Sequence, residues 1–182
     1  MKVKDLIMLC AEMGCLDVDE GAVSDDATAG GTCARQLLNC CNSTLEELYR
    51  DYASSIRKTV VEAVEGFIDT SQLNLCKVIS LVDGEGYDVK YRYSDGGLRV
   101  KEDGRFNLCY ARLPGSVGLD DDIPLPSPRI TERILAYGIL REYFSINGDA
   151  YAASQWEERY RGALRIADVK SSAMTMPTRR WL

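Results

Sequence analysis

Apolar residues recur at helical spacing near the start of the chain. In residues 2–13 they lie three or four positions apart, which predicts a first helix that ends at Gly14. The same spacing continues from Thr32, a suitable N-cap, to about residue 57. A polar break precedes Thr44, at which this second helix could restart. We therefore expect helices at about 2–13 and 32–57.

The last third of the chain predicts two further amphipathic helices, at about 128–145 and 149–168. Proline after serine at 127–128 is typical of a helix start, and Gly148 of a helix end. Asp149 is a suitable N-cap for the helix that follows. We expect an αα-hairpin in which the packing residues are Tyr137, Gly138, Tyr143, Trp156 and Tyr160.

Between the two helical regions the apolar period changes to two. The run from Tyr87 to Tyr93 alternates aromatic or apolar with charged residues, and glycine-containing turns separate it from similar short runs. This predicts an antiparallel β-meander at about 60–111. Residues 59–68 fit a strand or a continued helix, and their β-branched residues favour the strand. The proline-containing residues 112–127 then form an extended linker back to the helices.

The predicted fold class is α+β, mainly α: a helical bundle with an inserted antiparallel β-meander and an extended C-terminal tail. A chain of 182 residues can bury one sizeable core. We expect a single domain over residues 1–168, followed by an arm at 169–182 that lacks periodicity.

Charge and composition narrow the possible partners and the cell compartment. The net charge of −6 argues against a dedicated nucleic-acid binder, although the chain after residue 128 carries an excess of basic residues. No apolar run is long enough to span a membrane, and the N-terminus is interpreted as a helix rather than a signal peptide. Seven cysteines without an export signal favour a reduced, cytoplasmic setting.

The residue types present exclude most catalytic chemistry. The chain has no histidine, which removes histidine-based triads and most zinc sites, and its cysteines do not form C-x-x-C pairs. We expect no catalytic residue, no metal site and no cofactor. The densest acidic cluster is Asp120, Asp121 and Asp122; a solvated loop is its leading interpretation, and acids that line an inner surface come second.

The C-terminal arm has an unusual composition for a solvated end. It is either a frayed terminus or a docking segment, and tryptophan, arginine and methionine are typical of the latter. The candidate docking residues are Met174, Met176, Pro177, Arg179, Arg180, Trp181 and Leu182.

This layout resembles the head-to-tail adaptor (connector) proteins of tailed bacteriophages over about residues 32–168. The segment VISLVDGEGYDVKYRY is similar to the family's central hairpin, and GLDDDIPLP at 118–126 to its linker. The family's A-x-G-x-x-x-E-Y, G-D and W-x-x-R-Y patterns match Ala136, Gly138, Glu142, Tyr143, Gly148, Asp149, Trp156, Arg159 and Tyr160.

The resemblance implies a non-enzymatic virion protein, assembled in the host cytoplasm and located in the neck. It implies a ring, usually of twelve copies, that lies below the portal protein and joins the head to a tail or stopper component. Double-stranded DNA would pass through this ring without sequence-specific binding. The arm would reach into the portal, and Asp120–Asp122 would be candidates to face the channel.

Two other classes of function stay open at the level of the sequence. One is a cytoplasmic protein–protein adaptor that binds through the helical hairpin and forms no ring. The other is a small enzyme with a carboxylate-based site around Asp120–Asp122, against which the missing histidine counts.

Overall fold

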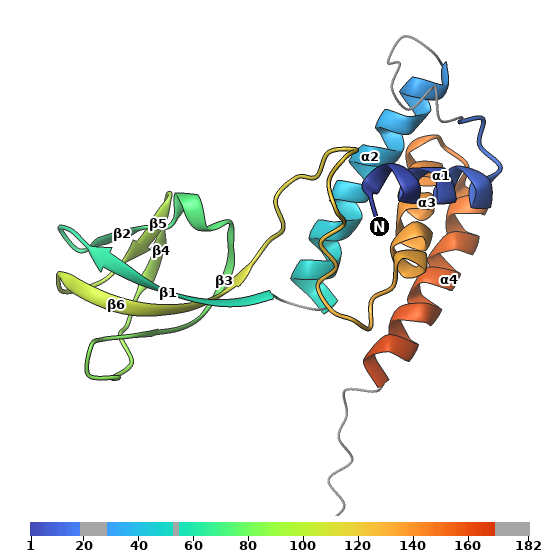
Figure 1. Ribbon diagram of the computed structural model, residues 1–182. Helices are drawn as coiled ribbons and strands as arrows, with labels where there is room; N and C mark the ends of the chain where they lie inside the picture. Colours follow the sequence, from blue (N-terminus) through green and yellow to red (C-terminus); the bar gives the residue numbers. More distant parts are fainter. Residues whose placement is uncertain (19–28, 53–54, 170–182) are drawn as a thin grey trace, which may run out of the picture. The chain divides into compact units, whose positions relative to one another are not determined.

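A computed structural model of the protein describes residues 1–18, 29–52 and 55–169 (Figure 1). These residues form four α-helices and two small antiparallel sheets, so the predicted α+β, mainly α class is confirmed. The helices are α1 (Val3–Gly14), α2 (Ala29–Glu47), α3 (Glu132–Ile146) and α4 (Ala150–Val169). The strands are β1 (Ser55–Ala63), β2 (Phe67–Asp69), β3 (Leu75–Val82), β4 (Arg92–Ser94), β5 (Gly97–Arg99) and β6 (Gly104–Arg112).

The chain divides into two compact units. The first, here called the helical unit, combines Met1–Thr44 with Gly118–Leu182, and the second, the β unit, is Leu45–Val117. The strands are therefore inserted between helices contributed by both ends of the chain. That residues 1–168 behave as a single domain stays a prediction.

Helix α1 packs against α3 in the helical unit, and Gly14 makes this approach possible. A Cβ atom at Gly14 would lie 2.9 Å from Cδ2 of Leu140. Cys15, with φ of 51°, adopts the left-handed conformation that we expected at Gly14. Gly14 is thus needed for space rather than for its backbone angles. The buried side chains of this unit include Leu6, Ile7, Cys10, Leu37, Cys41, Leu135, Ile139 and Tyr160.

Helix α2 differs from its prediction at both ends. It begins at Ala29, so Thr32 lies inside the helix, and it continues through Thr44 without restarting. It ends at Glu47, a π-helical turn covers Leu48–Tyr52, and β1 begins at Ser55, so the predicted extension to residue 57 is wrong. Spacings of three and four could not separate helix from strand here, and the β-branched residues 59–61 favour the strand.

Helix α3 begins later than predicted. Thr131 is its N-cap, with a hydroxyl oxygen 3.4 Å from the backbone nitrogen of Ile134, which donates to it. Ser127 instead closes a turn, since its carbonyl accepts a hydrogen bond from the backbone N–H of Ile130. The predicted cap at Asp149 is confirmed: its Oδ1 accepts a 2.9 Å hydrogen bond from the N–H of Ala152.

The strands of the β unit pair antiparallel but not in the sequential order of a meander. One sheet has the order β1-β6-β3 and the other β2-β5-β4. A tight turn at Glu65 and Gly66, both with positive φ, links β1 to β2. A bridge between Val82 and Asp88 joins the end of β3 to the segment before β4. These links join the two sheets around one apolar core.

The predicted strand from Tyr87 to Tyr93 is mostly irregular. Only its end belongs to β4. At its start, the carboxylate of Asp83 accepts hydrogen bonds from the backbone N–H groups of Glu85 and Tyr87 and holds a turn. The predicted strand from Phe106 to Tyr110 is confirmed within β6. The core of the β unit is formed by Ala63, Ile68, Val78, Leu81, Leu98, Phe106, Leu108 and Tyr110.

Candidate functional site

The α3–α4 hairpin places Gly138 at a point where three helices lie close together. Gly138 is buried, and a Cβ atom there would clash with Cγ2 of Thr44 in α2 and lie 3.0 Å from Cε2 of Tyr160 in α4. Glycine therefore permits α2, α3 and α4 to meet at this point. Gly138 and Tyr160, two of the predicted packing residues, lie next to each other.

Tyr160 is fully buried below a charged cluster. The Arg141 guanidinium lies 4.9 Å from the centre of the Tyr160 ring, a cation–π distance. Arg141 also forms ion pairs with Glu142, at 2.5 Å, and with Glu157, at 3.3 Å. One arginine thus links the two helices of the hairpin by stacking and by charge.

A second aromatic contact also joins the two helices of the hairpin. The rings of Tyr137 and Trp156 have centroids 5.8 Å apart and are tilted by 33°. Arg133 donates a 2.8 Å hydrogen bond to the Tyr137 hydroxyl, and the Arg159 guanidinium lies 4.7 Å from the Trp156 ring centre. Tyr137 and Trp156, two of the predicted packing residues, thus contact each other across the hairpin.

Tyr143 contacts α2. The thiol of Cys33 donates a 3.2 Å hydrogen bond to the Tyr143 hydroxyl, and burial, with this bond, raises the pKa of Tyr143 to about 12. Burial also raises the pKa of Cys40 to about 11 and that of Cys41 to about 12, and it raises the pKa of Cys10 further. These cysteines are protonated at neutral pH, so they pack as small apolar residues.

The raised thiol pKa values predict that stability decreases at alkaline pH. An unfolded cysteine ionises near its ordinary value of 9.0, whereas the folded Cys40 and Cys41 retain their protons until pH 11 or above. The unfolded state then binds fewer protons, so the free energy of unfolding falls as the pH rises from 9 to 11. Urea titrations across this range should show a shallower decline in the C40A/C41A variant than in the native chain or in C15A, whose cysteine is exposed. Parallel declines would contradict this.

The three consecutive aspartates have separate roles around the start of α1. Asp121 turns back to accept a 2.7 Å hydrogen bond from the Gly118 N–H. Asp122 and Asp120 lie 3.4 Å and 4.0 Å from the ammonium groups of Lys2 and Lys4. All three are exposed, and they do not converge on one point. Their location on a channel stays a prediction.

The remaining predictions concern the C-terminal arm, metal binding and membrane-spanning helices. The candidate docking residues 174–182 fall outside the described residues. Among the described residues, no group of three or more cysteine or acidic side chains could hold a metal ion. No helix within them is both long and apolar enough to cross a bilayer.

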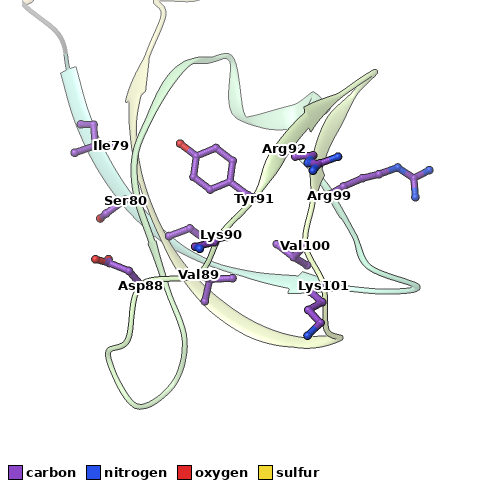
Figure 2. Close-up of a pocket in the computed structure, with 11 residues that line it drawn as sticks. Ile79, Ser80, Asp88, Val89, Lys90, Tyr91, Arg92, Arg99, Val100 and Lys101 are labelled. Atoms are coloured by element: carbon purple, nitrogen blue, oxygen red, sulfur yellow. The ribbon is translucent and has the colours of Figure 1, made fainter.

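The β unit contains an open pocket of about 820 Å³ that the sequence did not predict. It is lined by residues 79–81, 88–92 and 99–101, from β3, the segment before β4, and β5 with its exit. Figure 2 shows Tyr91 pointing into the pocket, with Arg92 and Arg99 on one side and Asp88 on the other. The sequence signal was the alternation of aromatic and basic residues from 87 to 93, which we interpreted only as a strand with one charged face.

Comparison with protein-family models and with curated protein sequences found no match.

Proposed function

We propose that the protein is a head-to-tail adaptor of a tailed bacteriophage, a non-enzymatic subunit of a ring that binds the portal protein. The observation that carries the proposal is the place of the family-like motif residues in the helical unit. Gly138 and Tyr160 lie where three helices meet, and Gly148 with Asp149 forms the turn between α3 and α4. These motif residues therefore have defined structural roles in the turn and the packing of this hairpin.

The outward face of the hairpin supports self-association. Tyr151 and Ile166 in α4, and Ile146 at the end of α3, are large apolar side chains that are mostly exposed. Tyr151 and Ile166 lie fifteen residues apart, about four helical turns, and so fall near one stripe of α4. A neighbouring copy in a ring would cover this stripe, and repetition of a small interface around a ring stabilises the assembly.

The carboxylate-based enzyme has less support. Asp121 is engaged with the backbone of its own turn, while Asp120 and Asp122 face lysines, so no pair of these acids is placed for acid–base catalysis. The cytoplasmic protein–protein adaptor differs from the leading proposal in its partner and in forming no ring.

Co-assembly tests the proposal. The purified chain, mixed with the portal protein encoded by the same genome, should co-sediment with it and add density below the portal in electron micrographs. Absence of any complex would contradict the adaptor function. A monomeric free chain would not, because assembly can begin on the portal.

Removal of the arm tests its proposed role in portal docking. Deletion of residues 170–182 should weaken portal binding by at least about tenfold, since tryptophan and arginine anchors dominate interface energies. The control is S171A/S172A, which alters small polar residues of the same segment. Unchanged affinity after the deletion, measured by interferometry on immobilised portal, would refute the docking role and leave ring formation untouched.

A further inference from the structure

The pocket of the β unit has a strong local excess of positive charge in a chain that is acidic as a whole. Its lining includes four basic residues, Lys90, Arg92, Arg99 and Lys101, and one acidic residue, Asp88. All four cations are exposed. Within the described residues, no carboxylate forms an ion pair with any of them.

The register of the β4–β5 hairpin forces two of these cations together. Arg92 is the direct cross-strand partner of Arg99 in the antiparallel pair. Like charges directly opposite each other in a sheet destabilise it. An anion bound between the two guanidinium groups would relieve this repulsion, and guanidinium forks match the geometry of phosphate oxygens.

Aromatic side chains accompany the basic residues. Tyr91 lines the pocket, and its ring meets that of Tyr93 edge to face at 5.7 Å. The Tyr93 hydroxyl accepts a 3.2 Å hydrogen bond from the backbone N–H of Val78, which fixes the ring although Tyr93 is 61% exposed. Tyr87, which lies on the same segment, is 68% exposed.

Basic residues and an aromatic ring that line one pocket suit one class of ligand. Single-stranded nucleic acid offers a phosphate on every nucleotide and a flat base that stacks on an aromatic side chain. An acidic peptide would satisfy the cations but would gain nothing from the tyrosine faces. A duplex keeps its bases stacked inside, so it too would gain only from the charges.

We propose that this pocket binds single-stranded nucleic acid. Arg92, Arg99, Lys90 and Lys101 contact phosphates, and Tyr91, the tyrosine among the lining residues, receives a base. The inference goes beyond the adaptor function and does not rest on it, because the pocket lies within the β unit alone.

The net charge of −6 limits the strength of this binding but does not prevent it. Charges farther than about 10 Å away are largely screened at ~0.1 M salt, so the local cations dominate at the pocket. We expect a dissociation constant on the order of 10⁻⁵ to 10⁻⁴ M, which is typical of contacts to the nucleic-acid backbone.

Fluorescence anisotropy of a labelled oligothymidylate tests the proposal on the full chain. Binding at about 50 mM salt should weaken at least about tenfold in the R92Q/R99Q variant, and the slope of log affinity against log salt should fall by ~1.4, about 0.7 for each lost phosphate contact. The matched control is R57Q/R105Q, which removes two exposed arginines of the same unit that do not line the pocket. The control should bind within about threefold of the native chain.

Further measurements separate the proposal from its competitors. K90Q/K101Q should also weaken binding, which keeps the test decisive if R92Q/R99Q fails to fold by circular dichroism. Equal binding by the R92Q/R99Q variant and the native chain would overturn the proposal. Equally tight binding of a duplex of the same length, or of polyglutamate, would overturn the single-strand specificity. Portal co-assembly of R92Q/R99Q should be unchanged, so failure here is distinguishable from failure of the adaptor function.

Discussion

Replacing Tyr160 with alanine is expected to lower the free energy of unfolding by about 3–5 kcal/mol, the range for truncation of a buried aromatic residue. Tyr160 has no exposed surface, touches the site of Gly138 and lies below the Arg141 guanidinium. Its removal leaves a cavity and takes away the ring over which the Arg141 guanidinium lies. Urea denaturation followed by circular dichroism measures the loss.

The control for this prediction lies on the same helix. Tyr151 in α4 is 75% exposed, so Y151A should change the free energy of unfolding by no more than about 0.5 kcal/mol. A similar loss in Y151A and Y160A would show that the hairpin does not pack as described.

Replacing Gly138 with alanine should also destabilise the helical unit, by about 1–3 kcal/mol. Alanine favours a helix over glycine by about 1 kcal/mol, but the added methyl group would clash with Thr44 and crowd the Tyr160 ring. Both neighbours are buried, so neither can move aside without cost. The clash therefore outweighs the gain in helix propensity.

Gly162 provides the opposite case. It also lies inside a helix of the hairpin, yet no atom lies within 4 Å of the Cβ that alanine would add. G162A should therefore stabilise the protein by up to about 1 kcal/mol. The two substitutions should shift the urea midpoint in opposite directions, and a shift in the same direction would contradict the packing around Gly138.

Local signals explain which parts of the fold the sequence predicted. The turn at Gly148 and the cap at Asp149 depend on neighbouring residues, so the pattern placed the start of α4 correctly. The start of α3 was predicted at Ser127 and Pro128, but Thr131 is the N-cap and the helix begins at Glu132. The predicted end of α2 was wrong because an apolar residue at every fourth position fits a helix face and equally one side of a strand.

Non-local pairing explains what the sequence did not predict. β6 pairs with β1 and β3, and β5 pairs with β2, and no turn signal encodes these partners. The pocket depends on the same registers. Lys90 and Arg92 were visible as a charged strand face, but only the hairpin register shows that Arg99 arrives opposite Arg92. The basic pocket could therefore be identified only from the structure.

The acidic net charge of the chain and the basic charges of the pocket act over different distances. A net charge of −6 disfavours extended contact with a polyanion, as a channel subunit requires. Four cations in one pocket act over a few ångströms, where screening by salt is weaker. A weak, salt-sensitive contact to a single strand is therefore compatible with a ring that lets a duplex pass.

The most direct test of the account is the symmetry and stoichiometry of the complex with the portal protein encoded by the same genome, measured by electron microscopy and native mass spectrometry. The adaptor function predicts a closed ring of this chain below the portal, of twelve copies in the arrangement that the resemblance implies. A portal that binds no copies, or binds single copies without a ring, would contradict it.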